Sequence, residues 1–170
     1  MSVLDKISLS ELKSRALDLK PDTKAFFAKL RKRKPRNLDK IMQELHLEVF
    51  AEIDCLDCGN CCKSISPTLY DKDVERLAKH LKMKPSQFVD KYLYVDDDGD
   101  YVFQHTPCPF LMPDNYCMVY DMRPKACREY PHLDRKRFYQ ILNLTLKNTE
   151  VCPAVFDAVE KLKDRKGEII

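Results

Sequence analysis

The stretch Cys55-Leu56-Asp57-Cys58-Gly59-Asn60-Cys61-Cys62 places four cysteines within eight residues. The first three follow a CxxCxxC spacing, in which two intervening residues let the chain turn so that neighbouring thiolates converge on one centre. Three thiolates at successive CxxC steps suit an iron–sulfur cubane, because each can bind a different iron while a remote cysteine binds the fourth. A single zinc ion usually takes one CxxC pair from a loop and a second pair from elsewhere in the chain.

The other four cysteines lie in the second half of the 170-residue chain. Cys108 and Cys117 flank a short predicted hairpin, which would bring them close together. Cys152 precedes Pro153 at a predicted helix start, where the helix dipole and unpaired N–H groups stabilise a thiolate. Burial as a small apolar side chain is the alternative for one or two cysteines, with Cys62 and Cys152 the best candidates. The predicted metal ligands are therefore Cys55, Cys58, Cys61, Cys62, Cys108, Cys117, Cys127 and Cys152.

Several groupings of these ligands remain open. In the first hypothesis a 4Fe-4S cluster is held by the CxxCxxC cysteines and a remote thiolate, either Cys127 or Cys108. In the second, the eight thiolates form two structural zinc sites of four thiolates each. Because Cys61 and Cys62 are adjacent, we expect their side chains to diverge and not to serve one iron together. The expected cofactor is thus an iron–sulfur cluster or zinc.

Composition narrows the class of protein. The 30 basic and 27 acidic residues give a formal net charge of +3, which points neither to nucleic acid nor to a membrane surface as a partner. No run approaches the roughly 18 apolar residues of a spanning helix, and the first twenty residues have no apolar segment of the signal-peptide type. We therefore expect a cytoplasmic protein, in which cysteines are metal ligands or redox thiols rather than disulfides. A protein partner or substrate stays open.

Apolar periodicity predicts a mainly α fold with one or two short β-hairpins, forming a small irregular domain organised by metal. Residues 1–54 are expected to be an N-terminal helical segment that packs on the core, and residues 55–170 the cysteine-cluster metal-binding domain, together one compact unit. Further helical patterns follow in 69–81, 88–93 and 155–162. Asp98-Gly99 predicts a hairpin turn, and residues 110–120 a second hairpin. Leu142, Leu144 and Leu146 fit either a helix or a strand.

The basic run KLRKRKPR, residues 29–36, has two interpretations. It could bind nucleic acid, or it could be a solvated helix end where cations favour the negative end of the dipole. No aromatic residues are interleaved with the run, which favours the solvated helix end.

The motifs CLDCGNCC, CPFL, YCMVYDMRPKAC, REYP and NTEVCP together resemble the CxxCxxCC family, also called YkgJ-type cysteine-cluster proteins. The resemblance runs from about Cys55 to Cys152, and that family is described as zinc- or iron-chelating. It implies that the cysteines of these motifs serve a metal centre. One branch resembles flagellin lysine methylases with an iron–sulfur cluster, so a cluster-dependent enzyme that modifies proteins is a third alternative. This chain has no glycine-rich nucleotide loop, and whether it is an enzyme stays open.

Side chains around the cysteines complete the predicted site. Arg123 could donate hydrogen bonds to the cluster sulfurs or bind an anionic ligand, or it could pair with Asp121 on the surface. Tyr120 is expected to pack and shield the site. Arg128 is expected on the surface, and Tyr130 to pack. Of the four histidines, His46 and His80 lie on helical patterns and are predicted surface or boundary residues. The other two, His105 and His132, are alternative ligands, but thiols are favoured because eight are available.

Overall fold

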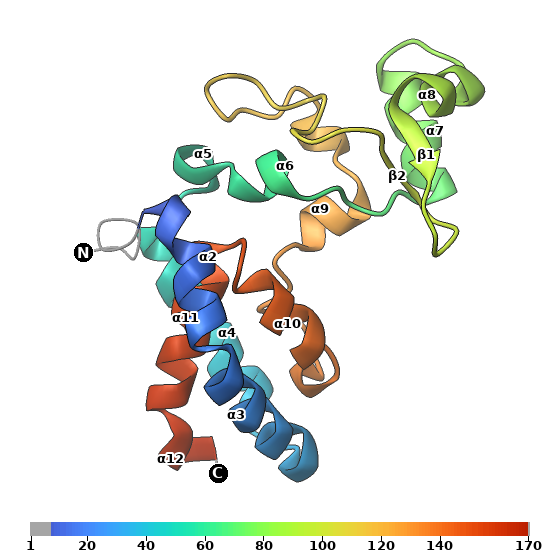
Figure 1. The fold of residues 1–170 in the computed structure, drawn as a ribbon. Coiled ribbons are helices and arrows are strands. Elements are labelled where there is room, and N and C mark those ends of the chain that lie inside the picture. Colours follow the sequence, from blue (N-terminus) through green and yellow to red (C-terminus); the bar gives the residue numbers. More distant parts are fainter. Residues whose placement is uncertain (1–7, 170) are drawn as a thin grey trace. The chain divides into compact units, whose positions relative to one another are not determined.

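A computed structural model describes residues 8–169 of the chain, and these residues are mainly helical with one small antiparallel sheet (Figure 1). The predicted fold class is confirmed. Contacts divide the chain into two compact units, defined as unit 1 (Met1–Asp54 and Pro131–Ile170) and unit 2 (Cys55–Tyr130).

Unit 1 is a helical unit with an apolar core. Its elements are α2 (Leu9–Asp18), α3 (Lys20–Arg33), α4 (Leu38–Glu52), η2 (Phe138–Gln140), α10 (Leu142–Asn148), α11 (Pro153–Asp164) and α12 (Lys166–Ile169). The main packing is between α4 and α11, where Leu45 and Val49 from one helix and Val155 and Val159 from the other are at most 1% exposed. Such apolar faces recur at helical spacing, which is why the sequence pattern predicts these helices.

The division into 1–54 and 55–170 stays a prediction. Contacts place a unit border after Asp54 and group the chain from Pro131 onward with the N-terminal helices. The physical reason is that α11 supplies the apolar face against which α4 packs. Residues 1–7, which belong to the predicted N-terminal segment and to the start that has no signal-peptide pattern, lie outside the described residues.

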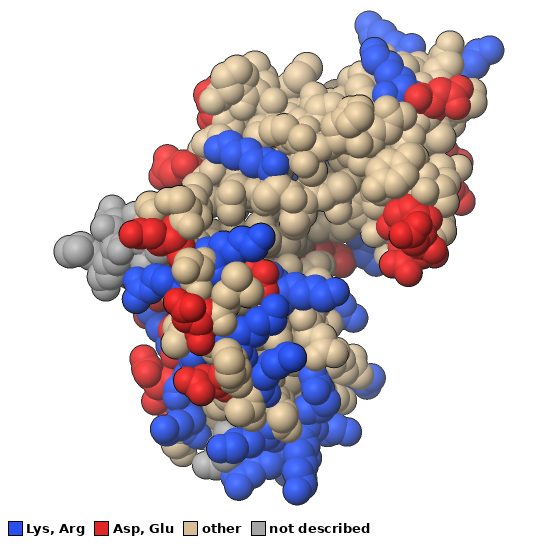
Figure 2. All heavy atoms as spheres, in the orientation of Figure 1, with Lys and Arg blue, Asp and Glu red and all other residues tan. Residues whose placement is uncertain are grey.

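The basic run lies at the C-terminal end of α3. Three of its cations, Arg31, Lys32 and Arg33, occupy the last turn, and Lys34 follows in a left-handed conformation with φ of 47°. Figure 2 shows Lys and Arg side chains gathered over this end of the helix. Cations in a last turn face the partial negative charge of the unpaired carbonyls, so the position agrees with a solvated helix end.

Unit 2 has shorter elements around a second apolar core. In chain order they are α5 (Cys55–Cys58), α6 (Asn60–Ser64), α7 (Asp71–His80), α8 (Pro85–Tyr92), β1 (Leu93–Val95), β2 (Tyr101–Phe103), η1 (Tyr120–Met122) and α9 (Lys125–Glu129). Phe88 of α8 is fully buried and packs against Phe110, whose ring also meets Phe103 edge-on at 5.7 Å. This core lies among α7, α8 and the hairpin.

The predicted hairpin at Asp98-Gly99 is confirmed. Strand β1 pairs antiparallel with β2, with Leu93 opposite Phe103, and Gly99 adopts φ of +86° in the turn. The second predicted hairpin is present as a single bridge between Leu111 and Cys117. None of the helices within residues 8–169 is long and apolar enough to cross a membrane.

Candidate metal centre

The cysteine-rich stretch folds as two very short helices joined by a tight turn. Helix α5 carries Cys55 and Cys58, and α6 carries Cys61 and Cys62. Between them Gly59 adopts φ of 56°, a left-handed conformation that glycine accepts most easily. The turn changes the chain direction between the two pairs of cysteines.

Gly59 is also needed because the second hairpin approaches it closely. A Cβ at this position would lie 2.8 Å from Oδ1 of Asn115, well inside van der Waals contact. Nδ2 of Asn115 donates a hydrogen bond of 2.7 Å to the carbonyl of Leu56. The Gly59–Asn115 contact therefore ties α5 to the turn of the hairpin that ends in Cys117.

A backbone contact brings the next cysteine to α6. The amide of Cys108 donates a hydrogen bond of 2.7 Å to the carbonyl of Cys62. The pairing of Leu111 with Cys117 then returns the chain toward Cys108. Segments that are about 45 to 55 residues apart in sequence thus converge beside Cys62.

Four thiols of unit 2 influence one another electrostatically, and we call them the thiol tetrad: Cys62, Cys108, Cys117 and Cys127. The pKa of Cys127 is raised to about 12, first by burial and then by negative charge on the other three members. Burial likewise raises the pKa of Cys108 to about 11, with contributions from Cys62 and Cys117. The pKa of Cys117 is raised by burial and by Cys62. Every pair within the tetrad therefore interacts.

Cys62 differs from the other tetrad members. Its pKa is lowered to about 7, first by a hydrogen bond with Cys61 and then by the positive charges of Arg123 and Lys63. The Sγ atoms of Cys61 and Cys62 lie 4.0 Å apart. The expectation that these adjacent side chains diverge is therefore wrong, since their sulfurs lie within contact distance.

The remaining predicted ligands have different surroundings. Cys58 is buried, and its pKa is raised by burial, with a smaller contribution from Cys62. Cys55 is exposed. Cys152 belongs to unit 1, where it is the N-cap of α11, as predicted, and lies partly buried against the apolar core.

The donor chemistry fits zinc or iron, although the side chains are not drawn together around a point. Within residues 8–169, no three His, Cys, Asp or Glu side chains are grouped closely enough to hold one metal ion. No disulfide joins any of the eight cysteines, all of which lie in the described part of the chain. Thiols that are partly buried, mutually interacting and reduced are the donor set that zinc and iron–sulfur centres use.

The positive charge of Arg123 acts on three of the four tetrad thiols. It contributes to the lowered pKa of Cys62 and opposes the rise in the pKa of Cys117 and Cys127. The guanidinium carbon lies 3.6 Å from the centroid of the Tyr120 ring, and Nε donates to the Tyr120 carbonyl at 2.8 Å. Arg123 and Tyr120, the two residues predicted beside the ligands, therefore contact each other. Among the described residues, Arg123 forms no ion pair with Asp121.

The other candidates take less part in the site. His46 and His80 lie on α4 and α7, half-buried and exposed respectively, as the helical patterns predict. His105 is exposed, and His132 belongs to unit 1. Arg128 is exposed and Tyr130 half-buried.

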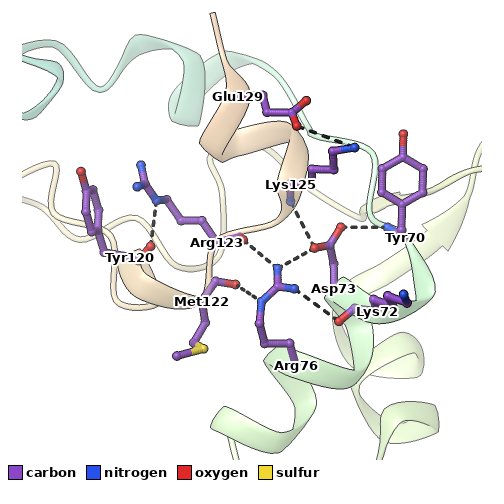
Figure 3. Close-up of polar contacts among 9 residues, drawn as sticks. All are labelled: Tyr70, Lys72, Asp73, Arg76, Tyr120, Met122, Arg123, Lys125 and Glu129. Carbon is purple, nitrogen blue, oxygen red and sulfur yellow. Dashed lines mark hydrogen bonds and ion pairs between the residues drawn. The ribbon is translucent and has the colours of Figure 1, made fainter. Parts of the chain in front are cut away.

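One polar cluster beside the site was missed by the sequence patterns. Asp73 and Arg76 of α7 contact the backbone from Met122 to Lys125, just before the helix that carries Cys127 (Figure 3). The apolar pattern in 69–81 predicts the helix but says nothing of its polar face. An acid at the third position of a helix is a capping signal, and it could have drawn attention to Asp73.

Fold and donor set together define a small helical domain with a cysteine cluster. A model of the CxxCxxCC family, described as "Putative zinc- or iron-chelating domain", matches residues 54–153. The match covers more than half of the chain, so the protein belongs to this family, as the sequence motifs predict. No curated protein matches the chain, and no solved structure does.

Proposed function

We propose that the protein holds a 4Fe-4S cluster in unit 2 through the thiol tetrad Cys62, Cys108, Cys117 and Cys127. The observation that supports this proposal most is the mutual interaction of all four thiols. The tetrad changes the ligand grouping expected from spacing alone. It takes Cys62 in place of the CxxCxxC cysteines and keeps both remote candidates, Cys108 and Cys127.

A cluster needs a wider arrangement of thiols than a single ion does. In a cubane each thiolate binds its own iron, so the four sulfurs lie farther apart than around one ion. The mutual interaction of the four thiols agrees with that larger arrangement.

The chain itself supplies the ligands and balances their charge. A ligating thiol must lose its proton, and Cys62 with its pKa of about 7 is the tetrad member that does so most readily. Cys108 and Cys127 keep their protons at neutral pH until a cation displaces them. Arg123 lies where it offsets the negative charge of the thiolates. When bound, the cluster would supply one-electron chemistry or an anchored site for a substrate.

A structural zinc site is the second candidate, and the close pair Cys61 and Cys62 favours it. Their Sγ atoms are 4.0 Å apart. Zinc–sulfur bonds of about 2.3 Å in a tetrahedron give sulfur–sulfur separations of about 3.8 Å. This pair could therefore bind one zinc ion with two further thiolates. Thiolates accept both metals, so aerobic production could load zinc into an iron site.

Anaerobic purification followed by iron, sulfide and zinc analysis tests the proposal. We expect a brown protein with iron and sulfide in near-equal amounts, and Cys117→Ser should lose most of both. Cys152→Ser is the matched control, because serine also serves as an N-cap and this position lies outside unit 2. A colourless wild type with tightly bound zinc would favour the second candidate. Full iron content in Cys117→Ser would refute the tetrad.

A further inference from the structure

Asp73 is a buried carboxylate that connects two helices. It is only 3% exposed, and its oxygens accept hydrogen bonds from the amides of Tyr70 and Lys125, each at 3.1 Å. The first amide belongs to the N-cap of α7 and the second to the first residue of α9. One carboxylate thus satisfies unpaired N–H groups at the starts of two helices that are far apart in sequence.

Arg76 continues the same connection. Its Nη2 atom pairs with Asp73 at 2.5 Å and also donates to the carbonyl of Arg123 at 2.8 Å. Nε donates to the carbonyl of Met122 at 3.3 Å. In Figure 3 the guanidinium and the carboxylate lie side by side between α7 and this segment. The pair therefore holds the backbone at Met122, Arg123 and Lys125.

The held segment carries two groups that act at the thiol tetrad. Arg123 lies within it, and Cys127 follows two residues after Lys125. Helix α9 has only five residues, far fewer than the roughly 12 that an isolated helix needs for marginal stability. Its position must therefore come from contacts outside itself, and Asp73 and Arg76 provide polar ones.

We propose that Asp73 and Arg76 form a positioning pair for the metal centre, holding the segment 122–125 so that Cys127 and Arg123 face the other tetrad thiols. The inference rests on the proposed tetrad. Partners of this kind, which contact no metal themselves, typically change metal affinity about 10- to 100-fold when they are lost. The pair differs from an ordinary surface ion pair because the Asp73 side chain is only 4% exposed and each partner also binds backbone of the cysteine-bearing segment.

The test compares Asp73→Asn with Glu129→Gln in the metal-loaded, full-length protein. Glu129 forms an exposed ion pair with Lys125 on the same α9, at 3.7 Å, and touches neither Asp73 nor Arg76. Metal release to a chelator is timed, and alkylation of each cysteine is mapped by mass spectrometry. We expect release to be at least tenfold faster in Asp73→Asn, with Cys127 the tetrad thiol that gains most reactivity, and no change in Glu129→Gln.

The outcomes separate a positioning role from a general structural one. Unchanged release, or equal gains of reactivity at all four tetrad thiols together with loss of helix signal, would overturn the proposal. If Asp73→Asn does not fold, Arg76→Lys decides in its place, since it keeps the charge beside Asp73 but loses the fork that reaches two carbonyls. A metal-retaining Cys117→Ser would instead refute the tetrad, independently of the positioning pair.

Discussion

The paired helices of unit 1 are much longer than the helices that carry cysteines in unit 2. The paired helices α4 and α11 of unit 1 have 15 and 12 residues, whereas α5, α6 and α9, which carry cysteines in unit 2, have 4 or 5. Long amphipathic helices bury enough apolar surface to hold one another. Helices of one turn do not, so the cysteine-bearing part of unit 2 depends on specific contacts and, in the proposed function, on metal.

The largest effect on stability is expected in the core of unit 1. Leu45 on α4 is 1% exposed, and Leu45→Ala should lower the free energy of unfolding by about 2–5 kcal/mol through lost burial and a cavity. Urea unfolding measures the change in the free energy of unfolding. The metal content of the folded protein should stay the same. Leu47→Ala on the same helix is the control, because Leu47 is 66% exposed and should change stability very little. Loss of metal from the folded Leu45→Ala protein would contradict the expectation that metal binding in unit 2 does not depend on the core of unit 1.

The next effect is expected at the turn between α5 and α6. Gly59→Ala forces a side chain into a left-handed conformation, at a cost of roughly 1–2 kcal/mol, and pushes Asn115 away. We expect weaker metal binding, because the hairpin that ends in Cys117 loses its contact with α5. A competition assay with a chromogenic chelator measures the affinity.

Gly99→Ala provides the matched control for that substitution. Gly99 also has positive φ, at +86°, but nothing lies within 4 Å of an added Cβ. It should cost similar backbone strain and leave metal affinity unchanged. Equal losses of affinity in both variants would mean that backbone strain, and not the contact with Asn115, is responsible.

The smallest expected effect is a local pH dependence in unit 1. The pKa of Glu11 lies below its usual 4.5, first because of the hydrogen bond from the Ser8 hydroxyl and then that from the Ser8 amide. Because its pKa is lowered in the folded protein, the ionised Glu11 carboxylate stabilises the start of α2 above pH 4.5. This stabilisation is lost as the pH falls through the pKa of Glu11 in the folded protein. The amide resonance of Ser8 should follow that titration in NMR spectra. If the Ser8 titration disappears in Glu11→Gln, Glu11 is its source. An unchanged Ser8 titration in that variant would exclude Glu11.

The sequence predicts the long helices well because apolar periodicity records which face is buried. The ambiguous segment around Leu142, Leu144 and Leu146 is helical, with Leu142, Thr145 and Leu146 buried and Leu144 40% exposed. A strand would have placed the three leucines on one face. Packing of α10 against α3, which periodicity alone does not contain, decides between the two.

The site is less predictable than the fold. All eight cysteines are visible in the sequence, but spacing cannot tell that Cys62 interacts with Cys127 or that Cys152 belongs to unit 1. Those facts depend on contacts between distant segments, such as the hydrogen bond between the Cys108 amide and the Cys62 carbonyl. The roles of Asp73 and Arg76 were missed for the same reason, since their partners lie about 50 residues further along the chain.

Hydrogen exchange with and without metal tests most directly whether metal organises unit 2 and not unit 1. Amide exchange would be followed by mass spectrometry in the full-length protein, before and after anaerobic removal of metal with a chelator. We predict faster exchange in residues 55–64 and 108–130 on removal, with α4 and α11 unchanged. Identical exchange of residues 55–64 and 108–130 in the two states would contradict the account.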